Sequence, residues 1–98
     1  MDDKAIVFHP SAAAEAEAAF NWYHERSLIA ARAFILELNQ AVEKVSAAPE
    51  SWPPYENNLR KYVFPRFPFI LFYRILNQEI QIIAVAHAKR RPGYWKSR

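Results

Sequence analysis

The chain has 98 residues, of which 52% are hydrophobic and 15% aromatic, and this composition excludes an intrinsically disordered protein. It has no cysteine, which excludes a disulfide framework, and no apolar run approaches the roughly 20 residues needed to cross a bilayer. The net charge of +3 hides an asymmetry, because residues 1–58 carry four cations against nine acids and residues 59–98 carry nine cations against one acid.

The chain begins with a predicted strand and a predicted helix. Residues 5–8 are apolar and stop at His9-Pro10, which predicts a brief strand, because a proline cannot donate to a sheet ladder. Proline suits the first turn of a helix, and the alanine- and glutamate-rich stretch that follows has a high helix propensity. We therefore expect the first helix over residues 11–25.

A second helix is predicted over residues 28–47, where apolar residues recur at the helical period. Ser27 is its expected N-cap and Pro49 its stop, while Glu37 falls among the polar residues on the other faces of the helix. Two amphipathic helices with so short a connection should pack as an antiparallel hairpin. We interpret this hairpin as a scaffold and not as a reactive centre.

The second half of the chain changes from a helical to a strand pattern. A proline-rich loop over residues 49–58 precedes predicted strands at 59–64, 69–76 and 79–86, with Asn77-Gln78 as a hairpin turn. The order β-α-α-β-β-β predicts an α+β fold in which an antiparallel sheet packs against the helical hairpin. Alternation gives the middle strand two faces without deciding which one the helices cover: Phe69, Leu71, Tyr73 and Ile75 against Ile70, Phe72 and Arg74.

Residues 88–98 form a basic C-terminal tail. Arg90 and Arg91 carry guanidinium groups, which bind phosphate or carboxylate through two parallel hydrogen bonds. Tyr94 and Trp95 can stack on a base, fill a groove in a partner or dock on the domain, and we expect Trp95 to dock because a large aromatic is usually buried. The tail indicates an acidic or polyanionic partner, and a merely solvated basic surface is the alternative.

Further candidates lie just outside the tail. His87 ends the last predicted strand, where it can serve as a general base, and a histidine bonded to the backbone at the edge of the sheet is the alternative. Arg60, Lys61 and Arg66 form a second basic group. No spacing of histidine, aspartate or glutamate matches a metal site, so we expect neither a metal nor a cofactor.

The length fits a single domain over residues 1–98 with one modest core. The N-terminal sequence Met-Asp-Asp-Lys is acidic and lacks the basic-then-apolar order of a secretory signal. We therefore expect a cytoplasmic protein that makes no contact with a membrane.

Three segments carry a resemblance to a known family: Leu59-Arg-Lys-Tyr, Phe67-Pro-Phe-Ile-Leu-Phe-Tyr-Arg and Ala84-Val-Ala-His-Ala-Lys-Arg-Arg-Pro-Gly-Tyr-Trp. With this order of elements, the chain resembles the RelE/ParE superfamily of bacterial toxins from about Ile6 to Trp95. Those proteins are the toxic halves of type II toxin–antitoxin, or plasmid-stabilisation, modules. The resemblance implies a cytoplasmic toxin whose basic surface is covered by the flexible segment of a cognate antitoxin.

The superfamily divides by target. RelE-like members are mRNA interferases that cut messenger RNA in the ribosomal A site, whereas ParE-like members inhibit DNA gyrase and arrest growth. RelE-like enzymes place lysines on the second strand, an arginine within the central strand, and an arginine and a tyrosine near the C-terminus. In this chain Ile70 stands at the central arginine position, which removes a charge-stabilising contact of about 2–4 kcal/mol. The resemblance therefore implies the ParE-like branch, a gyrase inhibitor that is not an enzyme.

Two alternatives stay open. The first is a RelE-like, metal-independent endoribonuclease acting on ribosome-bound mRNA, with these candidate catalytic residues: Lys61, His87, Arg90, Arg91 and Tyr94. The second is a toxin-like domain that has lost toxicity and only binds its partner. The residues expected to contact the target or the antitoxin are Arg60, Lys61, Arg66, Arg74, Lys89, Arg90, Arg91, Tyr94 and Trp95.

Overall fold

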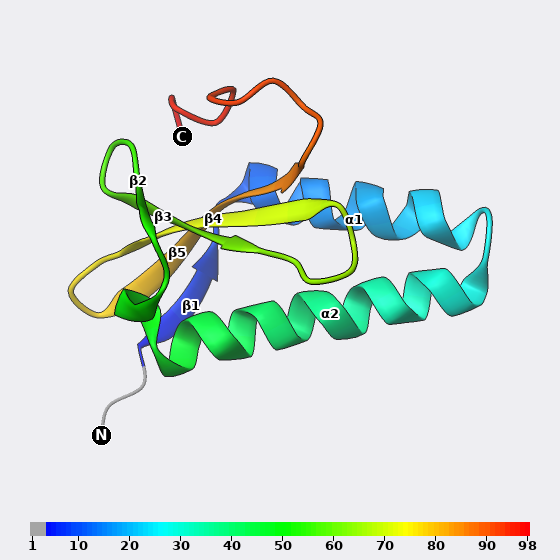
Figure 1. The fold of residues 1–98 in the computed structure, drawn as a ribbon, viewed down its shortest axis with the longest axis horizontal. Helices are drawn as coiled ribbons and strands as arrows, with labels where there is room; N and C mark the ends of the chain where they lie inside the picture. Colours follow the sequence, from blue (N-terminus) through cyan, green and yellow to red (C-terminus); the bar gives the residue numbers. More distant parts are fainter. Residues whose placement is uncertain (1–3) are drawn as a thin grey trace.

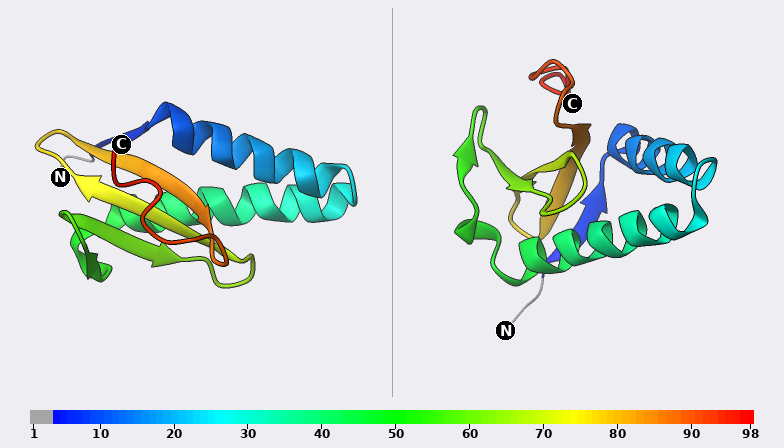
Figure 2. Two further views of the ribbon diagram at one scale, coloured as in Figure 1. Left: turned by 90° about the horizontal axis from the view of Figure 1, so that it is seen from above. Right: turned by 45° about the vertical axis from the view of Figure 1, so that its right-hand side comes forward.

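The computed structural model describes residues 4–98, so the acidic start of the chain at residues 1–3 lies outside the described part. Five strands form one sheet, with these bounds: β1 Ala5–Phe8, β2 Pro54–Tyr55, β3 Leu59–Val63, β4 Phe69–Ile75 and β5 Glu79–His87. Across the sheet the strands follow the order β1-β5-β4-β3-β2. Two helices cover one face, and the C-terminal tail crosses the other face (Figures 1 and 2).

The predicted α+β order of elements is confirmed, but the sheet is mixed and not wholly antiparallel. β1 pairs in parallel with β5, because the helical hairpin returns the chain to the end of the sheet where β1 begins. β3 and β5 then run in the direction of β1, and β4 runs against them. The predicted loop also contains β2, which pairs with β3 across a turn that holds Asn57 and Asn58 at φ 60 and 61. Two consecutive positive φ angles are what a type I′ hairpin turn requires.

The helices are α1 (Pro10–His24) and α2 (Leu28–Ala47), close to the predicted bounds. His9 caps α1, since its Nδ1 accepts a hydrogen bond of 3.0 Å from the Ser11 N–H. Ser27 caps α2 as predicted, accepting from the Ala30 N–H at 3.1 Å. A short 3-10 turn at Pro49–Ser51 follows α2. Within residues 4–98, neither helix is apolar enough over a sufficient length to span a membrane.

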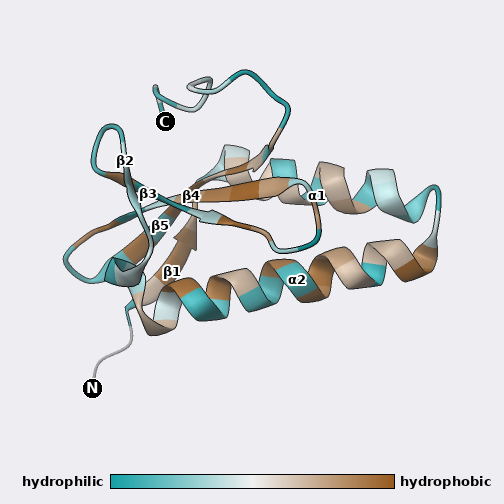
Figure 3. Ribbon diagram, in the orientation of Figure 1, coloured by the Kyte–Doolittle hydropathy of each residue, from teal (hydrophilic) through white to brown (hydrophobic). Residues whose placement is uncertain are grey.

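The sheet has apolar side chains on both faces, and each face packs against a different part of the chain. In the ribbon coloured by hydropathy, β1 and β4 are mainly hydrophobic (Figure 3). Phe69, Leu71 and Tyr73 of β4 lie under the helices. Their side of β4 is therefore the one that the helices cover, which alternation along the strand could not decide. Phe72 lies on the opposite face, beneath the tail. The helices therefore bury only one side of the sheet, and the other side depends on the tail for cover.

A bulge in β5 distributes its apolar residues between the two faces. Phe72 pairs with Ala84 and Tyr73 with Ile82, so Ile83 is an extra residue in β5. The residues that pack on the helical side are Ile80, Ile82 and Val85, and those that pack beneath the tail are Ile83, Ala84 and Ala86. Because β5 has apolar side chains on both faces, its sequence is an almost continuous hydrophobic run.

Glu37 departs from its predicted position on a polar face of α2. It is only 5% exposed, and its Oε2 accepts hydrogen bonds of 2.9 Å from the backbone N–H groups of both Arg66 and Phe67. The helical period cannot reveal this role, because the partners lie about thirty residues further along the chain. Glu37 therefore holds the β3–β4 turn against α2.

Leu38 lies between α2 and the sheet and is 7% exposed. We expect Leu38→Ala to lower the free energy of unfolding by about 2–5 kcal/mol, because the substitution removes buried apolar surface and leaves a cavity. Leu36 on the same helix is 59% exposed, so Leu36→Ala is the matched control, expected to change stability by less than about 0.5 kcal/mol. Denaturation in urea measures both, and equal midpoints for the two variants would contradict this packing.

Candidate functional site

The tail, residues 88–98, leaves the end of β5 and crosses the sheet on the face away from the helices (Figure 2). Gly93 has φ 92, a left-handed conformation that suits glycine, and it lies in the turn that leads to Trp95. The Trp95 ring stacks on Phe72 with 4.0 Å between centroids and 25° between the planes. Trp95 is 3% exposed, so it docks on the domain as the sequence predicts.

Glu15 of α1 fixes the end of the tail. Its two carboxylate oxygens accept hydrogen bonds of 3.0 Å from the two terminal nitrogens of Arg98. Oε1 also accepts from the Val85 N–H at 2.9 Å, and Arg98 Nη1 donates to the Ile83 carbonyl at 3.0 Å. Both side chains of this ion pair are 15% exposed, and Arg74 donates to the Arg98 carbonyl at 3.1 Å. Sequence reasoning did not single out Glu15, because its partner is 83 positions away.

A second ion pair ties the tail to the turn between β2 and β3. Lys96 Nζ lies 3.0 Å from a carboxylate oxygen of Glu56, and both side chains are more than half exposed. An exposed pair of this kind contributes at most about 1 kcal/mol. The tail is therefore held mainly by Trp95 and by the Glu15–Arg98 pair.

Arg90 and Tyr94 lie against each other near the same carboxylate. The guanidinium carbon of Arg90 is 3.6 Å from the centroid of the Tyr94 ring, and Arg90 Nη1 is 3.8 Å from Glu15. Burial, with the Glu15 carboxylate nearby, raises the pKa of Tyr94 to about 12, although the Arg90 and Arg98 charges act in the opposite direction. The buried Tyr94 hydroxyl makes no hydrogen bond with any described residue. Arg90 remains 56% exposed, so it is available to a partner.

Stability should fall at high pH partly because of Tyr94. Its pKa is higher in the folded than in the unfolded state, so its contribution is complete below pH 10 and is lost as the pH rises to about 12. We expect Tyr94→Phe to flatten this fall in urea unfolding measured across the range and to change stability little at pH 7, where no hydrogen bond is lost. Tyr73, with a pKa also raised to about 12, keeps part of the pH dependence. A variant with the wild-type pH profile would contradict this assignment.

The predicted cations do not gather into one patch. Arg60 and Lys61 are neighbours on β3 and point to opposite faces, because Arg60 pairs across from Tyr73 and Lys61 across from Phe72. Arg60 donates to the carbonyls of Glu50 and Trp52 at 3.1 and 2.7 Å. Arg74 is likewise engaged, with the Gln81 side chain and the Arg98 carbonyl. Within residues 4–98, no carboxylate pairs with the side chains of Lys61, Arg66, Lys89 or Arg91.

A hollow of about 150 Å³ brings three of the candidate catalytic residues together, and we call it the tail hollow. Lys61, His87 and Arg90 line it, with Tyr55 and Trp95 among the aromatic walls. Ile70, which the resemblance to RelE-like enzymes places at the position of their central arginine, also lines it. Two other candidates do not line it: Tyr94 lies toward α1, where it lines a different pocket, and Arg91 is exposed on the loop after β5.

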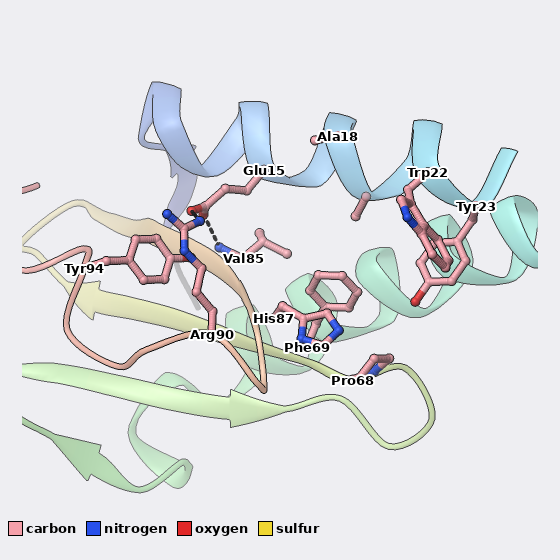
Figure 4. A pocket seen from close by; sticks show the side chains of 11 residues that line it. Glu15, Ala18, Trp22, Tyr23, Pro68, Phe69, Val85, His87, Arg90 and Tyr94 are labelled. Carbon is pink, nitrogen blue, oxygen red and sulfur yellow. Dashed lines mark hydrogen bonds and ion pairs between the residues drawn. The ribbon is translucent and has the colours of Figure 1, made fainter. Parts of the chain in front are cut away.

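A larger groove of about 570 Å³ lies between α1 and the end of β5, and we call it the α1–β5 groove (Figure 4). Its walls are mostly apolar, with Ala18 and Trp22 on α1 and Phe69 on the sheet. Glu15, Arg90 and Tyr94 form its polar end, and Trp22 is 53% exposed at the other. The sequence gives no sign of this groove, because α1, the start of β4, the end of β5 and the tail form it together, and these segments are far apart in the chain.

Comparison with known proteins identifies the family. The family described as the ParE toxin of type II toxin-antitoxin system, parDE, matches residues 6–92. A solved structure described as the chromosomal ParDE TA system from P. aeruginosa superposes with a TM-score of 0.77. The match covers 88% of this chain and 97% of that chain, and at 21% identity it shows the shared fold. No curated protein matches the sequence.

The family match spans β1, both helices, the sheet and the loop after β5, so it covers nearly all of the elements described above. It confirms the resemblance that the β3, β4 and β5 segments carry. The chain therefore belongs to the ParE toxin family of type II toxin–antitoxin systems, within the RelE/ParE superfamily.

Proposed function

We propose that this ParE-family chain is the toxin of a type II toxin–antitoxin module, that it arrests growth by inhibiting DNA gyrase in the cytoplasm, and that a cognate antitoxin neutralises it. The family match over residues 6–92 is the observation that carries the proposal. Inhibition here is a binding event and not a chemical step. A module of this kind would also stabilise a plasmid that carries it.

The loop at the start of the tail is the part best suited to meet an acidic surface of the target. Lys89, Arg90 and Arg91 are consecutive and exposed, and only Ala88 separates them from the end of β5. The docked Trp95 and the Glu15–Arg98 pair hold the chain on the far side of this loop. Because the loop that carries these cations is held at both ends, it loses little conformational freedom when a partner binds, which favours affinity.

We expect the double variant Arg90→Ala/Arg91→Ala to lose growth arrest and gyrase inhibition while its stability changes by about 1 kcal/mol or less, because both side chains are exposed. Growth after induction and supercoiling by purified gyrase measure the first effect, and urea denaturation measures the second. Arg26→Ala/Arg32→Ala, two exposed cations on the helical hairpin, is the matched control and should remain toxic. A double variant at 90 and 91 that still arrests growth would exclude this loop as the target surface.

One observation supports the second candidate function, a ribosome-dependent endoribonuclease. Lys61, His87 and Arg90 share the tail hollow, where a phosphate could meet two cations and a proton acceptor. Ile70 in the same hollow speaks against cleavage, since it supplies no charge for the phosphorane. Toe-printing of translated transcripts decides the matter: A-site cuts that disappear with Arg91→Ala would favour the ribonuclease, and intact transcripts would exclude it. Induction without growth arrest would instead indicate a domain that has lost toxicity.

A further inference from the structure

The outer edge of β3 is only partly covered. The two-residue strand β2 pairs with the first two residues of β3, and the chain before β2 adds one bond, from the Lys61 N–H to the Pro53 carbonyl at 3.2 Å. Upstream of Pro53 the chain leaves the sheet for the short 3-10 turn that follows α2. The end of β3 at Val63 therefore has β4 on one side and no strand on the other.

The backbone groups of Val63 point toward this open side. Phe64, the next residue, donates its N–H to a carbonyl at the start of β4 at 3.0 Å, whereas the Lys61 N–H points away from β4. Because successive residues of a strand present their backbone groups to alternate sides, Val63 shares the outward direction of Lys61. Neither the N–H nor the carbonyl of Val63 has a hydrogen-bond partner within residues 4–98. One residue of an antiparallel strand would satisfy both groups with two hydrogen bonds.

The side chains beside this edge are apolar and open to solvent. Val63 is 59% exposed, and it pairs across from Ile70 of β4, which is half-buried. Residues that pair across neighbouring strands share one face of the sheet, and Ile70 packs on the face that the tail crosses. A strand added at this edge would therefore place a side chain opposite Val63 on that face, where an apolar residue fits.

A cation stands on each side of Val63. Lys61, two residues before it, has its side chain on the same face and lines the tail hollow. Arg66, three residues after it, is exposed in the turn between β3 and β4. No carboxylate in the described part of the chain pairs with either side chain. The complementary ligand is an extended segment with an apolar residue opposite Val63 and an acidic residue nearby on each side.

The same charges make a second copy of this chain a poor occupant of the edge. Two β3 strands paired about a twofold axis at Val63 would place Lys61 of each copy opposite Pro65 of the other, next to Arg66. Like charges would then face each other, and Pro65 has no N–H to donate across the interface. The occupant that the edge fits is therefore a different protein, and an acidic one.

The open edge of β3 is continuous with the basic loop at residues 89–91. That loop leaves β5 at the end of the sheet where β3 also ends, and the Ala88 N–H donates to the Pro68 carbonyl of the β3–β4 turn at 2.8 Å (Figure 2). Neighbouring strands lie about 4.8 Å apart, so about 10 Å separates the edge of β3 from β5. A single partner can therefore contact the edge and the basic loop together.

We propose that an extended, acidic segment of DNA gyrase adds a short antiparallel strand to β3 at Val63, while the basic loop binds the same partner. This binding mode rests on the proposed function, because gyrase is the target named there and residues 89–91 are the target surface that the edge extends. Pairing of this kind gives affinity through backbone hydrogen bonds, and Lys61 and Arg66 select for an acidic segment.

The backbone bond is tested by comparing Val63→Pro with Val63→Ala. Both variants remove the valine side chain, but only the proline removes the outward N–H, and a sheet edge that faces solvent tolerates proline. Half-maximal inhibition of supercoiling by purified gyrase should need about ten times more Val63→Pro than Val63→Ala. Thermal unfolding confirms that both variants are folded. In the complex of the wild-type toxin with gyrase, hydrogen exchange at the Val63 amide should slow, a readout that needs no variant.

The acidic character of the partner is tested by reversing a charge beside the edge. Lys61→Glu would place like charges against each other, so inhibition of gyrase should weaken about tenfold or more. Lys44→Glu, at an exposed position of α2 on the opposite face of the sheet, is the matched control and should inhibit within about twofold of the wild type. Wild-type inhibition by Lys61→Glu would overturn the assignment of an acidic segment.

Other results would overturn the strand pairing itself. Equal inhibition by Val63→Pro and Val63→Ala, with unchanged exchange at the Val63 amide, would exclude it while leaving the proposed function intact. Slower exchange at this amide with the antitoxin but not with gyrase would assign the edge to the antitoxin, and slower exchange in the concentrated toxin alone would assign it to a second copy. Failure of the wild-type toxin to inhibit gyrase would overturn both the strand pairing and the gyrase part of the proposed function.

Discussion

Replacement of Trp95 by alanine is expected to lower the free energy of unfolding by about 3–5 kcal/mol. The indole is 3% exposed and stacks on Phe72, and its loss would open a cavity in the core between the sheet and the tail. That core has no helix to cover it, because both helices lie on the other face. Urea denaturation followed by circular dichroism measures the change. The buried Nε1 makes no hydrogen bond with a described residue, so the effect is one of packing alone.

Trp22 provides the matched control for this experiment. It is 53% exposed, with the Arg26 guanidinium carbon 3.8 Å from its ring centroid and the Tyr23 ring edge-on at 5.1 Å. Trp22→Ala should therefore lower stability by about 1 kcal/mol or less. If Trp95→Ala proves no more damaging than Trp22→Ala, the tail does not dock on the sheet in solution.

The second large effect is expected at Glu15. We expect Glu15→Gln to lower the free energy of unfolding by about 3 kcal/mol, because it leaves the mostly buried Arg98 guanidinium without a counter-charge and weakens the bond to the Val85 N–H. The tail should also become mobile, so trypsin should cleave faster after Lys89 and Arg90. Urea denaturation and the rate of tryptic cleavage at these sites measure the two effects separately.

Glu17, two residues further along α1 and exposed, is the control for Glu15. Glu17→Gln should leave stability within about 0.5 kcal/mol of the wild type and should not change the rate of cleavage in the tail. Equal results for the two variants would mean that the Glu15–Arg98 pair does not hold the tail. A destabilised Glu15→Gln variant with an unchanged cleavage rate would mean that the pair stabilises α1 and not the tail.

Local patterns predicted most of the elements. The apolar period of α2, the Ser27 cap and the strand-forming run of β4 each depend on residues close together in sequence, and each is found at nearly the predicted bounds. The short strand β2 was missed, although Asn57 and Asn58 at its turn are a recognisable signal for a hairpin. The parallel pairing of β1 with β5 was missed for a different reason, since no local pattern encodes the return path of the chain.

The candidate site was less predictable than the fold. Arg60 and Lys61 point to opposite faces of the sheet because neighbouring residues alternate along a strand, so the sequence alone was enough to predict that they do not share a patch. Glu15 and Glu37, by contrast, read as ordinary polar residues on helices, and only the tertiary fold shows that each holds a distant segment through hydrogen bonds. The α1–β5 groove is formed by α1, the start of β4, the end of β5 and the tail, so no single stretch of sequence contains its signature.

The parallel contact between β1 and β5 has a consequence for the order of events during synthesis. The strand that is translated first has no neighbour in the sheet until the strand that is translated last has emerged. Pairing between such distant segments is slow, since a long loop must close before the contacts form. While β5 is still inside the ribosome, β1 therefore has no strand to pair with, and the sheet stays incomplete until β5 has been made.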